Sequence, residues 1–270
     1  MHAEHVGRVE TRSDQVWPNL LRDRAATRGV ATPVGLPLLW HWTLFQDWVT
    51  PDAIGPDGHP RRGGFLPPLQ DLPRRMWAGG RVRVRDTLGA GEAVERVSTV
   101  LAVRETRGTA GQLVFVTVRH AISGPRGPAI EEEQDLVYRS IEGAAVKPAD
   151  PAAELPAGAL SRTVLPDPVL LFRYSALTGN GHRIHYDADY VRSVEGYPGL
   201  VVHGPLQATW MAALAEEGWG GIAAFRFRGH RPAFAGQALR VEGWREGGTV
   251  TLRTLDATGA VCMSGEAELA

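Results

Sequence analysis

The chain has few of the residues and segments on which several classes of protein depend. Its 270 residues include a single cysteine, Cys262, so we expect no internal disulfide, no redox thiol pair and no thiolate zinc site. No apolar run approaches the ~18 residues that cross a bilayer. The first residues have no apolar core like that of a secretory signal. The sequence therefore predicts a cytoplasmic protein that does not bind membranes.

The chain also has almost no excess of charge. Its 29 basic and 30 acidic residues give a formal net charge of −1, which provides no general attraction to nucleic acid or anionic lipid. The composition, 43% hydrophobic and 22% charged, is typical of globular proteins. The length suffices for one large domain or two small ones, each with its own core.

Two similar halves are separated by a segment rich in proline and alanine. Each half contains four segments whose alternation or β-branched content predicts strands; they begin at Arg81, Val94, Gln112 and Glu131, and at Ile222, Gln237, Thr249 and Ala260. Apolar residues at helical spacing predict a helix over His203–Gly218, ended by Gly218. A weaker helix candidate, Pro67–Trp77, is interrupted by Pro73. This pattern predicts an α+β protein made from a duplicated unit: residues 1–146, a linker at 147–162, and residues 163–270.

One stretch of the second half, Tyr174 to Asp187, concentrates polar groups in the sequence YSALTGNGHRIHYD. A histidine can accept or give a proton near neutral pH, whereas the amide of Asn180 can only orient its neighbours. Simpler explanations exist, since single histidines are usually structural or exposed and an asparagine between glycines is typical of turns. His182 and His185, with Asp187 nearby, also suggest part of a metal site. No third strong ligand with clear spacing accompanies them, so we predict no metal.

A second stretch, GYPGLVVHGPL from Gly196 to Leu206, leads into the predicted long helix. Gly204 and Pro205 fall in its first turn, where amide N–H groups have no partner within the helix and the dipole is positive. A glycine there lets a ligand oxygen approach the backbone, which suits a carbonyl that gains negative charge. Glycine is equally common at helix starts for conformational reasons alone.

The two stretches together resemble the MaoC-type (R)-specific enoyl-thioester hydratases and dehydratases. They are most similar to the type-2 hydroxyacyl-thioester dehydratase branch, which includes mesaconyl-CoA and itaconyl-CoA hydratases. The family hallmark, Gly-Asp-x-Asn-Pro-Leu/Ile-His-x-Asp, places its catalytic Asp at Asn180, its Asn at His182, its Pro at Arg183 and its catalytic His at His185. That branch typically shows this altered form. The segment Gly63–Val82 also resembles the N-terminal half of the branch.

The resemblance implies two hot-dog folds side by side, each an antiparallel sheet wrapped around a helix. Only the C-terminal unit would keep the catalytic loop and the full central helix, while the N-terminal unit would make room for an acyl chain. The two sheets would join edge to edge, with both helices on the concave face, in a monomer or at most a homodimer. The resemblance also implies a hydro-lyase that needs neither a cofactor nor a metal.

The resemblance further implies a role for each matching residue. His185 would be the general acid and base, Asn180 would hold the water, and the Gly204 amide would form the oxyanion hole. Arg173 or Arg183 would pair with the carboxylate of a short branched dicarboxylic acyl group, such as mesaconyl or itaconyl. Exposure without a partner is, however, ordinary for arginine. Four further residues are expected to contact substrate: Tyr174, His182, Tyr197 and His203.

Two other functions compatible with the fold stay open at this stage. In a hot-dog thioesterase, Asp187 would activate water to attack the carbonyl carbon. In a non-catalytic acyl-binding subunit, Asn180 in place of aspartate would mark an inactive site, although the retention of His185 and Gly204 argues against this. Straight fatty and polyketide-like acyl groups, coenzyme A or acyl carrier protein as the thiol, and either direction of reaction all fit the sequence.

Overall fold

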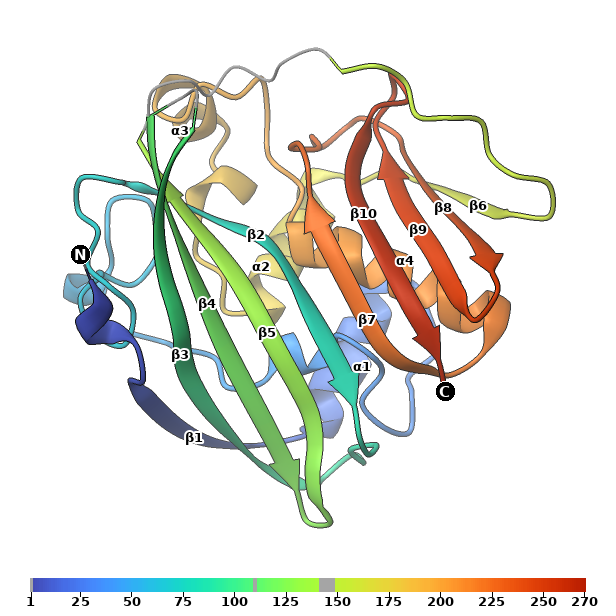
Figure 1. The fold of residues 1–270 in the computed structure, drawn as a ribbon, viewed down its shortest axis with the longest axis horizontal. Coiled ribbons are helices and arrows are strands. Elements are labelled where there is room, and N and C mark those ends of the chain that lie inside the picture. The colour runs from blue at the N-terminus through green and yellow to red at the C-terminus, as the bar shows by residue number, and fades with distance from the viewer. Residues whose placement is uncertain (1, 109–110, 141–148) are drawn as a thin grey trace.

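A single antiparallel sheet of ten strands runs through the computed structural model, which describes residues 2–108, 111–140 and 149–270 (Figure 1). Five strands come from the first half: β1 (Val9–Gln15), β2 (Arg74–Val84), β3 (Ala93–Gly108), β4 (Gly111–Gly124) and β5 (Gly127–Arg139). Five come from the second half: β6 (Leu160–Val164), β7 (Ile222–Gly229), β8 (Leu239–Glu246), β9 (Thr249–Leu255) and β10 (Val261–Leu269). The described α-helices are α1 (Pro18–Arg28), α2 (Pro168–Leu177), α3 (Ala188–Ser193) and α4 (Gly204–Trp219).

The order of the strands is the same in both halves. It reads β1-β3-β4-β5-β2 in the first half and β6-β8-β9-β10-β7 in the second, and the two halves meet where β2 pairs with β7. This confirms a duplicated unit and one extended sheet. Four strands were predicted per unit, whereas each unit has five. The two missed strands, β1 and β6, are short edge strands whose sequences are mostly polar and do not alternate apolar with polar residues. β6 begins at Leu160 and pairs with β8, so the linker ends earlier than residue 162; residues 147 and 148 lie outside the described residues.

The helices lie behind the sheet in the view of Figure 1. The predicted long helix is confirmed as α4, although it continues past Gly218 and is capped by Gly220. The helix expected over Pro67–Trp77 was wrong, because its prolines prevent helical hydrogen bonding and the chain enters β2 at Arg74. The first unit instead contains α1, whose only sequence signals are a proline in its first turn and Gly29 in the left-handed conformation after its last.

The seam between the two units requires residues without side chains. Gly79 and Gly80 in β2 lie opposite Arg228 and Phe227 in β7. A Cβ atom on Gly79 would lie 2.5 Å from the carbonyl oxygen of Phe227, and one on Gly80 would lie 2.8 Å from that of Glu133. The glycine pair therefore allows the two sheets to join without a gap.

One hydrophobic core extends beneath this seam and draws on both units. α4 contributes Met211 and Leu214 among others, and these pack in one cluster with first-half residues such as Leu39, Val82 and Ile130. Each such buried side chain stabilises the fold by about 1.5–3 kcal/mol relative to exposure. The shared core fixes the orientation of the two units, and with it any site built between them. Among the described residues, no helix is long and apolar enough to cross a membrane.

Candidate active site

The polar stretch of the second unit forms a compact loop between α2 and α3. The side chain of Asp167 caps the start of α2, and Gly179 adopts the left-handed conformation just after its end. A 3₁₀ turn then spans Arg183–His185. Asp187 caps α3 by accepting a hydrogen bond from the Tyr190 amide at 2.9 Å. The chain is thus fixed by hydrogen bonds on both sides of the two loop histidines.

His185 is buried at the centre of this loop and held in one orientation. Its Nδ1 lies 2.7 Å from the carbonyl oxygen of Val201, so Nδ1–H donates and Nε2 keeps a free lone pair. Its ring stacks on that of His203, with centroids 3.5 Å apart and planes 16° apart. Burial lowers the pKa of His185 to about 4, against a smaller opposing effect of the Val201 hydrogen bond. At neutral pH His185 is therefore an uncharged imidazole that can accept a proton.

His203 supports His185 from the helix side. It is 1% exposed, its Nε2 lies 2.9 Å from the Ser175 hydroxyl, and its Nδ1 has no hydrogen-bond partner among the described residues. The ring of Tyr174, also buried, lies 4.9 Å away in an edge-on arrangement. Burial, followed by the charge of His185, holds the pKa of His203 well below its usual value. The two stacked histidines are therefore neutral. Ser175, which forms a hydrogen bond with His203, was not predicted from the sequence.

Gly204 is the first residue of α4, directly after His203. Its position is half-buried, and among the described residues no hydrogen bond uses its amide N–H. A Cβ atom there would meet nothing closer than the Met263 methyl at 3.5 Å. A free N–H at the positive end of a long helix, next in sequence to the ring that stacks on His185, suits a developing oxyanion.

Asn180 faces a cavity that both units line. Its side-chain oxygen accepts the backbone N–H of His182 at 3.0 Å, which fixes the amide plane. The cavity has a volume of about 200 Å³, and Tyr174, Asn180 and Pro205 meet Trp42 and Phe45 of the first unit there. The wall from the first unit combines aromatic side chains with the charged Arg96 and Glu132, and nothing in the sequence pattern had indicated it.

Three other residues that were predicted to contact substrate do not line the cavity beside Asn180. Arg173 is exposed on α2. Arg183 is engaged by Asp187, with Nη2 2.8 Å from its carboxylate, and this leaves Asp187 as a cap and an ion-pair partner. Tyr197 is buried in a second core cluster, 5.7 Å from the guanidinium of Arg74.

A loop of the first unit completes the surroundings of the catalytic loop. The Arg183 amide donates to the carbonyl oxygen of Asp57 at 2.9 Å, and the ring of His59 lies 4.3 Å from that of His182. Donor atoms of Asp57, His59 and His182 all lie within 4.8 Å of one another and could hold a metal ion. The segment PDGHP from Pro56 to Pro60, with two titratable residues between prolines, is the sequence signal that had been overlooked.

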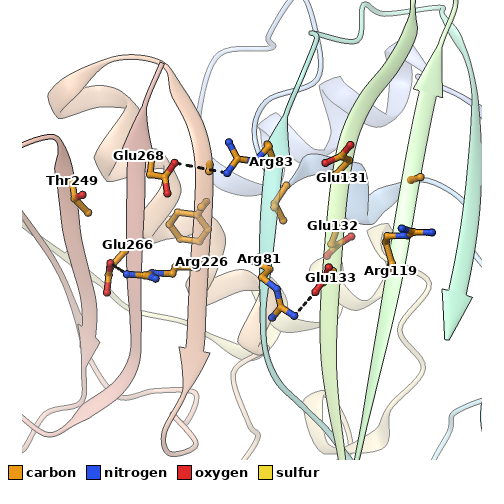
Figure 2. Close-up of a pocket in the computed structure, with 14 residues that line it drawn as sticks. Arg81, Arg83, Arg119, Glu131, Glu132, Glu133, Arg226, Thr249, Glu266 and Glu268 are labelled. Carbon is orange, nitrogen blue, oxygen red and sulfur yellow. Dashed lines mark hydrogen bonds and ion pairs between the residues drawn. The ribbon is translucent and has the colours of Figure 1, made fainter. Parts of the chain in front are cut away.

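A larger hollow of about 520 Å³ lies elsewhere, across the β2–β7 seam. Figure 2 shows its arginines and glutamates on different strands, with arginines on β2 and β7 and glutamates on β5 and β10, and with ion pairs Arg81–Glu133, Arg83–Glu268 and Arg226–Glu266. Val82, between two of these arginines, points into the core, so the charged side chains occupy the opposite face of the sheet from α4. Their charges compensate one another, and the hollow is remote from His185.

Comparisons with known proteins agree with this geometry. A model of the family described as hydroxyacyl-thioester dehydratase type 2 matches residues 39–235, which include both Asp57 and the His185 loop. A mesaconyl-C(4)-CoA hydratase from Chloroflexus aurantiacus is 41% identical over 274 residues, covering 98% of this chain and 96% of that protein. A hydroxyacyl-thioester dehydratase type 2 from Schizosaccharomyces pombe is 35% identical over 42% of this chain and 38% of its own.

Solved structures establish the architecture. A MaoC-like dehydratase from Phytophthora capsici superimposes with a TM-score of 0.74 at 17% identity, covering 100% of this chain and 98% of that one. A Mycobacterium tuberculosis protein described as having a double hot-dog fold gives 0.57 at 14% identity, covering 97% and 96%. The predicted double hot-dog fold is confirmed. The chain belongs to the hydroxyacyl-thioester dehydratase type 2 family and is a hydro-lyase.

Proposed function

We propose that this enzyme reversibly hydrates the coenzyme A thioester of a short branched 2-enoic dicarboxylic acid. The observation that carries the proposal is the pairing of a neutral, buried His185 with an unused amide N–H at Gly204. A hydratase needs a proton acceptor for water and a donor for the enolate oxygen. Similarity over almost the full length to a mesaconyl-C(4)-CoA hydratase supports the choice of acyl group.

In the hydration direction His185 moves the proton. Its Nε2 takes a proton from water as the water oxygen bonds to the β carbon, and the electrons of the double bond shift towards the thioester carbonyl. The Gly204 amide stabilises the resulting enolate oxygen, and His185 returns the proton to the α carbon. Asn180 holds the water, and no net charge remains on the protein. No step of this scheme requires a metal or a cofactor.

The acyl group would occupy the cavity beside Asn180, whose first-unit wall includes Trp42 and Phe45. For its carboxylate we propose Arg75 in β2, two residues before Trp77 of the cavity wall. Arg75 is half-buried, and its positive charge helps to lower the pKa of His59, after burial. By contrast, Arg183 is already neutralised by Asp187.

A panel of enoyl-CoA thioesters, followed at the ultraviolet band of the conjugated double bond, tests the proposal. We expect kcat/KM on mesaconyl-CoA or itaconyl-CoA to exceed that on crotonyl-CoA. Arg75→Ala should raise KM for the dicarboxylic substrates alone, and Arg173→Ala serves as the exposed control. A thioesterase would instead release free thiol from every ester, and this result would refute the hydratase. The occupied Asp187 side chain argues against that activity.

A further inference from the structure

The loop of the first unit that carries Asp57 and His59 is built onto the catalytic loop of the second. The Arg183 amide and guanidinium donate to the carbonyl oxygens of Asp57 and Pro56, at 2.9 and 3.1 Å. Gly58 and Gly181 face each other so closely that a Cβ atom on either would overlap the other's carbonyl oxygen. Such a fit leaves little freedom for the loop to move independently of the residues it covers.

Within this loop Asp57 and His59 form an oriented pair. One carboxylate oxygen of Asp57 accepts the His59 amide at 3.1 Å and the other lies 3.0 Å from His59 Nδ1. Nδ1–H therefore donates to Asp57, and Nε2 keeps a lone pair. Burial raises the pKa of Asp57, but its hydrogen bond and charge interaction with His59 outweigh this and lower it overall. Burial, then the charge of Arg75, lowers the pKa of His59 to about 4.

The pair continues into a row of histidine rings. His59 lies 4.3 Å from His182, His182 lies 5.7 Å from His185 with the rings perpendicular, and His185 stacks on His203. The donor atoms of His182, His59 and Asp57 lie within 4.8 Å of one another, and among the described residues no direct hydrogen bond joins the His182 side chain to the other two, so a single water would bridge them. His182 is therefore placed between the Asp57–His59 pair and the proton acceptor His185.

We propose that Asp57 and His59 are positioning residues of the active centre that act through His182. Because Asp57 holds the Nδ1–H of His59, the other nitrogen of His59 can only accept, and we expect it, through a bridging water, to favour the His182 tautomer whose near nitrogen carries the hydrogen. The far nitrogen of His182 then accepts a hydrogen bond. His182 and His185 together receive both hydrogens of the attacking water, while the Asn180 side chain, whose oxygen accepts the His182 amide, holds the water through its remaining hydrogen-bonding groups.

No proton passes through the Asp57–His59 pair in this scheme. One water proton goes to His185 and on to the α carbon, while the other stays on the new hydroxyl group, hydrogen-bonded to His182. The catalytic role rests on the proposed hydratase activity, but the selection of the tautomer does not. The first unit thus supplies more than space for an acyl chain, because it orders the proton acceptors of the second.

Kinetics of Asp57→Asn, His59→Asn and His182→Asn, singly and combined, test the catalytic part. Each of the first two should lower kcat by about 10- to 100-fold, as loss of supporting hydrogen bonds does elsewhere, with KM changed less than about 3-fold. In the His182→Asn background, Asp57→Asn should change kcat less than about 3-fold, because it acts through the missing ring. Asp52→Asn, in the same loop and exposed, is the control. The proposal would be overturned if the losses of kcat from Asp57→Asn and His182→Asn multiplied in the double variant, or if Asp57→Asn alone left kcat unchanged.

Long-range ¹H–¹⁵N spectra of the histidine rings test the tautomer without any substrate. We expect one His182 tautomer in the unmodified protein and a mixture of two in Asp57→Asn. An unchanged His182 spectrum, with only a loss of thermal stability, would reduce Asp57 to a structural role and refute the proposal. The side chains of Asp57, His59 and His182 also suit a divalent cation. The last experiment therefore measures activity after exhaustive chelation. Full activity is expected, and a loss that Zn²⁺ restores would replace the proposal with a metal site.

Discussion

The two units share one strand order but use the segment between their outer helix and their inner strand differently. In the C-terminal unit the segment between α2 and β7 folds into the catalytic loop, α3 and α4. In the N-terminal unit the segment between α1 and β2, residues 29–73, forms no α-helix. It supplies instead the aromatic wall at Trp42 and the loop with Asp57 and His59. Where the C-terminal unit has α4, the N-terminal unit therefore has a segment that lines the cavity beside Asn180 and packs against the His182 loop.

The buried polar groups of the two units differ in the same way. In the first unit, Glu132 lies 3.1 Å from His41 Nε2 and accepts the Trp42 indole N–H at 2.7 Å. Burial raises the pKa of Glu132, but His41 and Trp42 outweigh it, so the carboxylate stays ionised. In the second unit no carboxylate enters the stack of His185 on His203 among the contacts of the described residues. A hydrogen-bonded carboxylate suits stability, whereas a neutral stack keeps a histidine ready to accept a proton.

The largest expected effect is the loss of activity in His185→Ala. Removal of a general acid–base residue costs about 10²–10⁴ in rate, and we expect kcat to fall by at least that range while product still binds. Steady-state kinetics, with folding checked by circular dichroism, measures it. His230→Ala, an exposed histidine of the same unit, should keep its activity. If His185→Ala stayed within a few-fold and Asp187→Ala were inactive, the proton would pass through the aspartate.

The next effect concerns the buried carboxylate of the first unit. Glu132→Gln removes the charge that interacts with His41 and Trp42, and loss of one partner from a buried hydrogen-bonded group costs about 1–3 kcal/mol, more where the group is charged. Urea unfolding should show this loss. Glu131→Gln, an exposed neighbour on β5, should change stability by less than about 0.5 kcal/mol. A loss below about 1 kcal/mol in Glu132→Gln would mean that the carboxylate does not stabilise the first unit in the way its burial suggests.

A smaller effect is expected at Asn180. Asn180→Asp keeps an acceptor for the His182 amide, now 3.0 Å from the asparagine oxygen, and can still hold the water, so kcat should stay within about 10-fold. Asn180→Ala loses both contacts and should fall further, though less than His185→Ala. Steady-state kinetics on both variants ranks them. A more active Asn180→Ala than Asn180→Asp would show that the side chain does not position water.

Sequence reasoning succeeded where the pattern is local. The alternation of β7 to β10, the apolar spacing of α4 and the position of Gly204 in its first turn were all readable from the chain. It failed for β1, β6 and α1, which are polar elements stabilised by packing against neighbours far along the chain. Their local sequence carries little of the information that places them.

The candidate site shows the same division. The loop from Asn180 to His185 was recognisable as a motif because its residues are adjacent. Asp57 and His59 were not, because more than a hundred residues separate them from His182 and only the folding of the whole chain brings the two loops into contact. Arg183 illustrates a related point, because its ion pair with Asp187, four residues away, depends on the turn of the chain.

The smallest expected effect is an almost constant kcat/KM between pH 7 and pH 5.5. An ordinary histidine, with a pKa of about 6.5, would be about nine-tenths protonated at pH 5.5 and would cost the enzyme most of its base. Burial lowers the pKa of His185 to about 4, so it should stay neutral and lose activity only near that pH. Because the folded protein then binds fewer protons than the unfolded chain between pH 6.5 and 4, stability should fall as the pH drops through this window. Rates measured over pH 4–8, with unfolding followed at each pH, separate the two effects. A fall in kcat/KM centred near pH 6.5 in fully folded enzyme would show that His185 is solvated like a surface histidine. Its burial against His203 would then not lower its pKa.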